Sequence, residues 1–274
     1  MRNQSKTVGA IEVTTLSDGV LTAPLDVVLG MHKEEVERLA GRKDSLPISV
    51  NAFLLRLNGK WALVDTGAGN TMGPTLGKLS GNLRAHGVAP ESIELIFLTH
   101  LHPDHSNGLS DDAGEAIYPN AQVILHEAEA RFWLEREPAD GDNERVRRNM
   151  AKSALTIAPY RTNMRAVGEG EAVPGLSPVL MSGHTPGHTG WLIESGNERL
   201  LIWGDLVHFA AVQIARPDTG LIYDVDPHLA CATRRQMFER IAAEGLPVAG
   251  AHLDFPGFGK LVRDGTSFTF APDA

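Results

Sequence analysis

Short apolar runs rich in β-branched residues alternate along the chain with longer stretches of helical periodicity. Two pairs of runs predict β-hairpins: residues 50–57 with 60–64, and residues 191–194 with 199–203. The turn of the first hairpin is Asn58-Gly59, and such a pair supplies the positive φ that a tight turn needs. This alternation predicts an α+β chain with sheets at the centre and helices outside.

Helical patterns cover residues 74–86, 127–137, 144–154 and 231–244. Pro74 stands in the first turn of the first pattern, and Gly245 closes the last one, as expected at helix ends. Residues 168–178 are rich in Gly and Pro and predict a loop. Since no strong linker divides the chain, we expect a single domain over residues 1–274.

The second strand of each hairpin runs into an aspartate beside or near a glycine. The first reads VDTG at Asp65, and the second reads WGD at Asp205. This faint repeat indicates a fold of two similar halves.

Composition and charge narrow the classes of function. The chain has 274 residues, 42% of them apolar and 22% charged, which is typical of a packed globular protein. Its 25 basic and 34 acidic residues give a formal net charge of −9, so we expect no nucleic-acid partner.

One cysteine, Cys231, excludes an intrachain disulfide and a cysteine-based zinc cluster. The N-terminal residues lack the apolar stretch of a secretory signal, and no run approaches the roughly 20 apolar residues of a membrane span, so we expect a cytoplasmic protein without a membrane partner.

The most informative segment is LIFLTHLHPDHSNG, residues 95–108. Directly after an apolar strand, it places four metal-binding side chains on one loop: His100, His102, Asp104 and His105. Imidazole and carboxylate are good ligands for zinc and similar ions. The alternative is a polar surface loop, or histidines that cap the next helix. Clustering right after a buried strand favours a metal site.

Six residues of one loop cannot surround two ions, so further ligands must come from distant segments. His184, Asp205 and His252 each follow a predicted strand. Taken singly, the two histidines could be loop residues and the aspartate a helix cap. Their shared position at strand ends favours a joint site.

With these residues in place, the sequence resembles the metallo-β-lactamase superfamily, whose signature His-x-His-x-Asp-His is matched by residues 100–105. The segments NAFLL, LVDTGAG, GPTLGKL, HTPGHT, GDL followed by AAVQ, and AHLDFPGFG are similar to the methyl parathion hydrolase branch, whose site layout is similar to that of quorum-quenching lactonases. The resemblance implies a four-layer αββα sandwich.

The resemblance also implies a ligand set for two divalent ions, with zinc expected first and manganese, cobalt or iron as alternatives. One ion would take His100, His102 and His184, and the other Asp104, His105 and His252, with Asp205 bridging. Asp104 would also orient the hydroxide. From the sequence itself, Asp65 either orients a ligand imidazole or only forms a turn.

Residues around the substrate are harder to identify. The candidates are Trp133, Met72, Phe255, Phe258 and His208. Compared with the aryl organophosphate hydrolases of this branch, the chain is less aromatic around the expected leaving group. Phe255 and Phe258 either wall an apolar cleft or pack in the core, and His208 faces either the substrate or the core.

The sequence therefore predicts a binuclear metal-dependent hydrolase of small molecules that uses a metal-bridging hydroxide to cleave a lactone, an ester or a phosphotriester. Two divalent ions with Asp104, Asp205 and the hydroxide would keep about one net positive charge, which favours a transition state with negative charge on oxygen. Alternatives are a β-lactam or thioester hydrolase of the glyoxalase II kind, an RNA-processing nuclease, and a metal-binding scaffold without catalysis. The substrate stays open, and the sequence permits a homodimer.

Overall fold

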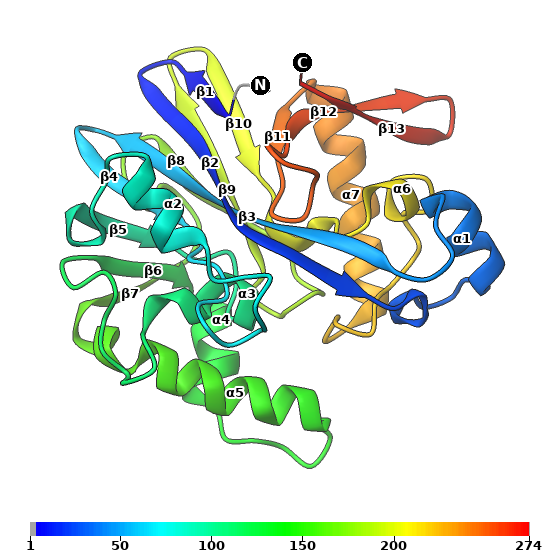
Figure 1. Ribbon diagram of the computed structural model, residues 1–274. Helices are drawn as coiled ribbons and strands as arrows, with labels where there is room; N and C mark the ends of the chain where they lie inside the picture. Colours follow the sequence, from blue (N-terminus) through cyan, green and yellow to red (C-terminus); the bar gives the residue numbers. More distant parts are fainter. Residues whose placement is uncertain (1–3, 274) are drawn as a thin grey trace.

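The computed structural model describes residues 4–273, and within them thirteen strands form two β-sheets that lie face to face (Figure 1). The first sheet has seven strands in sequence order: β1 (Ser5–Val8), β2 (Ile11–Ala23), β3 (Leu46–Leu57), β4 (Lys60–Val64), β5 (Ile93–Phe97), β6 (Gln122–His126) and β7 (Met164–Val167). The second has six strands, in the order β13 (Ser267–Pro272), β12 (Phe258–Asp264), β11 (Pro247–Ala249), β10 (Glu198–Ile202), β9 (Thr189–Ser195) and β8 (Leu176–Leu180).

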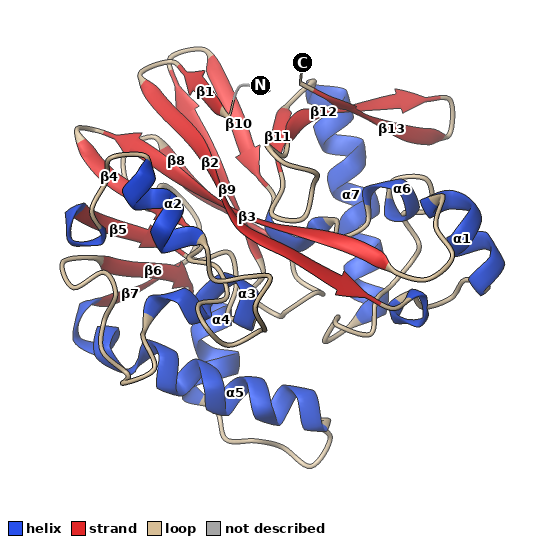
Figure 2. Ribbon diagram, in the orientation of Figure 1, coloured by secondary structure: helices blue, strands red, loops and turns tan. Residues whose placement is uncertain are grey.

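Helices cover the outer faces of both sheets, as Figure 2 shows. Within the described residues the α-helices are α1 (Lys33–Ala40), α2 (Leu79–Ala85), α3 (Pro103–Ser106), α4 (Glu127–Ala130), α5 (Glu144–Ile157), α6 (Ala210–Gln213) and α7 (Pro227–Glu244). None of the helices in this part of the chain combines the length and the apolar character needed to cross a lipid bilayer.

Alternation along the strands explains the four layers. On β3, Phe53 and Leu55 point to the core between the sheets, whereas Leu54 joins the core beneath α2 and α5. On β10, Ile202 faces the core between the sheets and Leu201 packs toward α7. Successive strand residues face opposite sides, so a strand covered on both faces reads as a continuous apolar run. The predicted αββα sandwich is confirmed.

Both halves contain the same three-strand unit. In the first sheet β3 and β4 form an antiparallel hairpin and β5 lies parallel to β4. In the second sheet β9 and β10 form the hairpin and β11 lies parallel to β10. The faint repeat in the sequence therefore corresponds to a repeat in topology, and each unit ends at an edge where polar side chains follow the strands.

Helix boundaries differ from the prediction at several ends: α5 continues to Ile157, and in the segment 127–137 α4 is followed by a π-helix over Arg131–Glu135. Two further differences have a visible cause. The helix expected over residues 74–86 begins only at Leu79, because the buried Asp18 carboxylate accepts hydrogen bonds from the backbone N–H groups of Ala68, Gly77 and Leu79 and holds the preceding segment as a loop. Helix α7 begins four residues before the expected Cys231, because the Asp226 side chain caps its first turn. Long-range hydrogen bonding in the first case and an unrecognised cap in the second account for the differences.

Candidate metal centre

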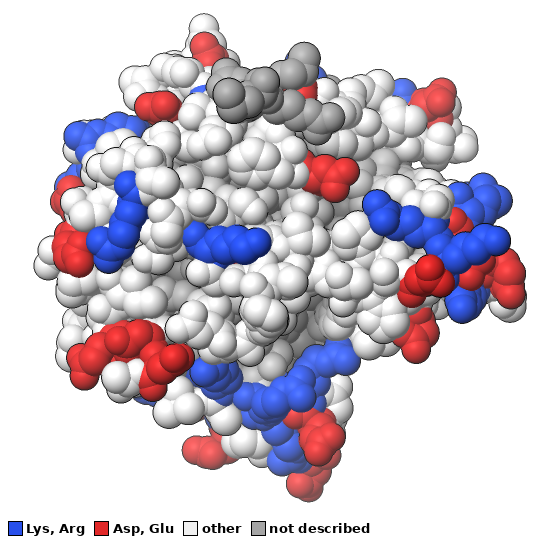
Figure 3. Space-filling model, in the orientation of Figure 1, with Lys and Arg blue, Asp and Glu red and all other residues white. Residues whose placement is uncertain are grey.

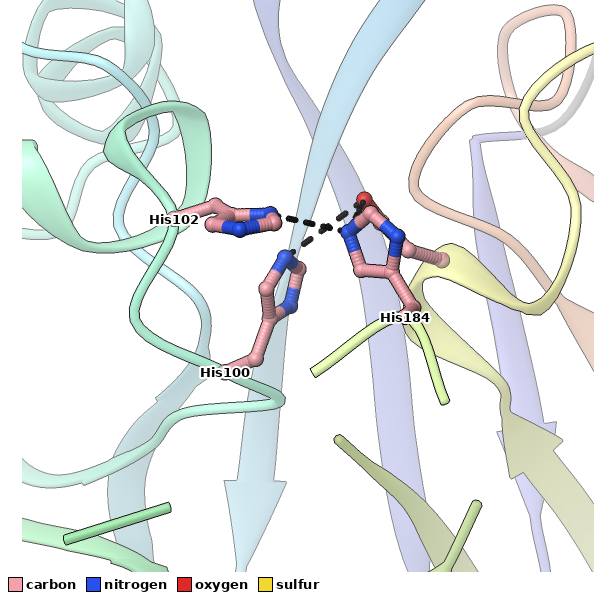
Figure 4. A group of neighbouring side chains, drawn as sticks. His100, His102 and His184 are labelled. Atoms are coloured by element: carbon pink, nitrogen blue, oxygen red, sulfur yellow. Dashed lines mark hydrogen bonds and ion pairs between the residues drawn. The ribbon is translucent and has the colours of Figure 1, made fainter. Parts of the chain in front are cut away.

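All seven predicted ligands follow strands whose ends meet at one edge of the sandwich. His100, His102, Asp104 and His105 lie on the loop and short helix after β5. His184 follows β8, Asp205 follows β10, and His252 follows β11. Figure 4 shows His100 and His102 pointing toward His184 across the gap between the loops. Six of the seven side chains are buried, and only Asp104 is partly exposed.

Two groups of donor atoms contain all seven predicted ligands, and within each group the atoms lie within 4.8 Å of one another. One group contains His100, His102, His184 and Asp205, and the other contains Asp104, His105 and His252. A third, overlapping group consists of Asp205, His208 and His252, so His208 also lies within reach of a metal ion.

Asp205 lies between the first two groups. Its Oδ2 is 3.5 Å from His100 Nε2 and 3.2 Å from His184 Nε2, while its Oδ1 is 3.1 Å from His105 Nε2 and 3.2 Å from His252 Nε2. One carboxylate thus reaches histidines of both groups.

The contacts within the centre are those of a cation site. His102 Nδ1 lies 2.8 Å from His184 Nε2, and His105 Nε2 lies 3.3 Å from His252 Nε2. Two buried polar atoms, His100 Nε2 and Asp205 Oδ1, have no hydrogen-bond partner within the described residues. Unpaired buried polar atoms are costly, and a divalent ion would satisfy several of these lone pairs at once. The donor set therefore fits two metal ions.

The charge states of His100, His102 and Asp205 suit metal binding directly. Burial holds the pKa of His100 and of His102 well below the usual histidine value, so both are neutral and can offer a lone pair. Burial opposes ionisation of Asp205, but the surrounding imidazoles hold its pKa well below the usual aspartate value. Neutral imidazole and ionised carboxylate are the forms that bind metal.

At His105, His184 and His252 burial lowers the pKa, but nearby carboxylates outweigh burial and raise the pKa, that of His184 to about 9. A metal ion would therefore displace a proton from each of these histidines.

Asp65 orients the histidines of the first loop. Its Oδ2 accepts a hydrogen bond of 2.8 Å from His105 Nδ1 and another of 2.8 Å from the Thr99 hydroxyl. The Thr99 oxygen in turn accepts from His100 Nδ1 at 3.0 Å. With the Nδ1 atoms of both histidines bound in this way, their Nε2 atoms face the centre, where each would offer a lone pair to a metal ion.

His184 and His252 are oriented by hydrogen-bond partners that the sequence did not indicate. His184 Nδ1 donates to Asp224 Oδ1 at 2.8 Å, and His252 Nδ1 donates to the Ser49 carbonyl at 2.7 Å. His188 is not part of the ligand groups: its Nε2 accepts from the backbone N–H of Asp205 at 2.9 Å and thereby positions that residue. Asp224 stands on a loop with no strand before it, so no local pattern marked it.

A second missed residue, the buried Glu129, joins the two loop regions. Its carboxylate accepts hydrogen bonds from the Leu101 N–H, the Thr185 hydroxyl and the Gly187 N–H at 2.7 to 3.0 Å. Burial raises the pKa of Glu129 to about 7, although the three hydrogen bonds act in the opposite direction and lower it. Glu129 thus ties the loop after β5 to the loop before β9.

A cavity of about 300 Å³ opens over the metal centre. Its lining includes the predicted residues Met72 and His208. His208 Nε2 lies 3.0 Å from Asp205 Oδ2, so this histidine faces the centre rather than the core. The other lining residues from outside the centre are Leu21, Thr22, Ala23, Ile48, Pro103, Arg145, Arg148, Asn149 and Tyr223.

Three aromatic candidates lie elsewhere. Trp133 is buried, and its ring packs edge-on against the His102 ring at 5.6 Å between centroids, so it supports a histidine from behind. Phe258 belongs to the core between the sheets, where it packs against Phe53. Phe255 is 38% exposed and lines a different, surface cavity. Of the two alternatives for these phenylalanines, packing in the core holds for Phe258, and neither ring lines the cavity over the metal centre.

The sequence profile of the metallo-beta-lactamase superfamily matches residues 46–243. The chain belongs to this superfamily. Membership confirms the predicted family.

Curated relatives include an N-acyl homoserine lactonase of Bacillus cereus, which is 28% identical over 44% of this chain and 40% of its own length. Another, from a Bacillus species, is 30% identical over 41% of this chain and 38% of its own length. The chain thus spans about two fifths of the length of these relatives.

Two solved structures are similar over almost the whole chain. The hydrolase AbOPH of the beta-lactamase superfamily is 33% identical, with a TM-score of 0.93 over 98% of this chain and 97% of its own. AidC, a dizinc quorum-quenching lactonase in complex with a product, N-hexanoyl-L-homoserine, is 25% identical, with the same TM-score and the same coverage.

Proposed function

We propose that the chain hydrolyses a small-molecule lactone or related ester with two divalent metal ions, zinc being the first expectation. His100, His102 and His184 would hold one ion, and Asp104, His105 and His252 the other, with Asp205 between them. The single observation that carries the proposal is the pair of donor groups joined by one carboxylate at the floor of a cavity.

Bound to these residues, two divalent ions would supply a nucleophile from water at neutral pH and polarise the substrate oxygen. The protein side chains do the remaining work. Asp65, Asp224 and the Ser49 carbonyl keep the Nδ1 proton on His105, His184 and His252 respectively. Asp104, the one partly exposed ligand candidate, lines the cavity and would orient the nucleophile. Preorganised ligands need no rearrangement during reaction.

The cavity favours a lactone with an apolar arm. Leu21, Ala23, Ile48 and Met72 line it from β2, β3 and the loop after β4. Such a surface suits an acyl chain better than a flat aromatic leaving group, for which stacked aromatic rings are the usual partner. The lactonase relatives and the product-bound lactonase neighbour add support. Carboxyl esters and phosphotriesters remain within the proposal because their cleavage needs the same centre.

A substrate panel tests the proposal. Protein loaded separately with Zn²⁺, Mn²⁺ and Co²⁺ would be assayed on N-acyl homoserine lactones of increasing acyl length, an aryl carboxyl ester, paraoxon, a glutathione thioester and nitrocefin. We expect two ions per chain by elemental analysis and fastest turnover of the lactones. Preferred turnover of the thioester or of nitrocefin would instead support the alternative hydrolases, and no turnover of any substrate by protein with two ions would refute the proposal.

We further propose a cytoplasmic location, the lack of a nucleic-acid or membrane partner, and assembly as a homodimer, which the sequence permits. Salt-dependent binding of RNA would contradict the second, and light scattering of the purified protein would decide the third.

A further inference from the structure

Two arginines of α5 line the cavity over the metal centre. Arg145 and Arg148 are three residues apart, so they project from the same side of the helix, and both belong to the cavity lining. Arg145 is half-buried and Arg148 is exposed. Figure 3 shows Lys and Arg side chains gathered at the lower part of this face, where α5 lies in Figure 1.

Neither arginine is paired with a carboxylate. Arg145 donates to the carbonyl of Ile222, and its guanidinium lies 5.2 Å from the centre of the Tyr223 ring. Arg148 has no hydrogen bond or ion pair with any residue in the range 4–273. By contrast, Arg136 on the neighbouring loop forms a two-bond pair with Asp142. The two positive charges in the cavity wall are thus free to act on a ligand.

The rest of the cavity offers no surplus positive charge. Two divalent ions would bring four positive charges. Asp104 and Asp205 lie among the ligands, and Asp65 and Asp224 each accept a hydrogen bond from a ligand histidine at 2.8 Å. These four carboxylates balance the ions. The net positive charge expected from the sequence applies to the ions, Asp104, Asp205 and the hydroxide, and the outer carboxylates of Asp65 and Asp224 offset it.

We infer that Arg145 and Arg148 form a subsite for an anionic group, so that the substrate is a lactone or ester that carries a carboxylate or a similar anion. This inference rests on the proposed function. Guanidinium groups pair with carboxylates and phosphates through two parallel hydrogen bonds. With the ester bond over the metal centre, the substrate's apolar part faces β2 and β3 and its anionic part faces α5.

The chain offers a matched control for this subsite. Arg147 stands on the same helix and is exposed, but it is not part of the cavity lining and donates to the carbonyls of Asp142 and Ala139. Arg148→Glu and Arg147→Glu make the same change in net charge on the same helix. Only the first changes the cavity. Arg145 is a poorer target, because its loss also frees the loop at Ile222.

The test compares a γ-lactone that bears a side-chain carboxylate with its carboxamide counterpart. We expect Arg148→Glu to raise KM for the carboxylate substrate at least about tenfold, as for the loss of a charge-assisted hydrogen bond, with little change in kcat. Arg148→Lys should retain part of the affinity, and 0.5 M salt should shrink the difference. KM for the carboxamide should stay within about twofold. Equal effects on both substrates, or an equal effect of Arg147→Glu, would overturn the inference.

Binding experiments separate this subsite from the proposed function. Glutarate and inorganic phosphate serve as probes in calorimetry on the metal-loaded protein. Weaker glutarate binding in Arg148→Glu than in Arg147→Glu supports the subsite even if neither lactone is opened, an outcome that would refute only the proposed function. A difference for phosphate alone assigns the subsite to phosphoryl groups, and no difference for either probe refutes it.

Discussion

The two three-strand units of the molecule place an aspartate at the same topological position and use it differently. Asp65 follows β4 in the first unit, and Asp205 follows β10 in the second. Asp205 contacts histidines of both donor groups. Asp65 instead contacts Thr99 and the outer nitrogen of His105. A shared place in the topology therefore does not determine whether a carboxylate meets the metal.

Backbone conformation is the visible cause. Asp65 has a φ of +61°, in the left-handed region that a non-glycine residue seldom adopts. Asp205 has a φ of −98° and a ψ of 25°. The turn at Asp65 directs its carboxylate to the Thr99 N–H and hydroxyl, and thus behind the histidines.

The loops after the parallel strands differ too. The loop after β5 carries four ligand candidates within six residues, whereas the loop after β11 carries His252 alone and then leaves the centre. The first unit thus supplies most of the imidazoles, and the second supplies the carboxylate that joins the donor groups.

The largest expected effect comes from Asp205→Asn. It removes the one charge shared by both donor groups, so hydrolysis should fall by more than about 100-fold, beyond the range for residues that only support a ligand. Elemental analysis should find fewer than two ions per chain. Two tightly held ions and near-normal turnover in this variant would break the distinction between the two aspartates.

Asp65→Asn should have a smaller effect. The amide can still accept from Thr99 but holds His105 less well, so metal affinity or activity should fall by about 10- to 100-fold. Competition with a chelator measures the affinity. A loss as large as that of Asp205→Asn would show that Asp65 does more than orient an imidazole.

Glu129→Gln tests the link between the units. The two carboxylate oxygens of Glu129 accept from three donors, whereas Gln has only one acceptor oxygen. The NH₂ group of Gln must therefore face at least one N–H or O–H donor. The free energy of unfolding, measured in urea without added metal, should fall by about 1 to 3 kcal/mol. An unchanged urea midpoint would mean that these hydrogen bonds do not hold the two loops together.

The smallest effect should follow Phe255→Ala, because this side chain is partly exposed and lies outside the catalytic cavity. KM should not change, and stability should change by no more than about 0.5 kcal/mol. Phe258→Ala, which empties part of the core between the sheets, is the contrast and should cost about 3 to 5 kcal/mol. A raised KM in Phe255→Ala would show that this side chain contacts the substrate.

Local sequence patterns determined both hairpins, the strands that precede the ligands, and the seven ligand candidates. Apolar runs mark buried strands, and polar side chains directly after them mark the edge where parallel strands end. The family signature at residues 100–105 added the implied division into two metal sites. The hairpins, the ligand candidates and the family signature each depend on residues that are neighbours in the chain.

Only the tertiary structure decided that Asp65 lies behind a ligand histidine, that Asp224 and Glu129 support the centre, and that Arg145 and Arg148 line the cavity. Asp224 contacts a histidine forty residues away, and Glu129 joins loops more than fifty residues apart. Side-chain direction at such points depends on backbone angles and on packing against distant segments. No periodicity or spacing within one segment carries that information.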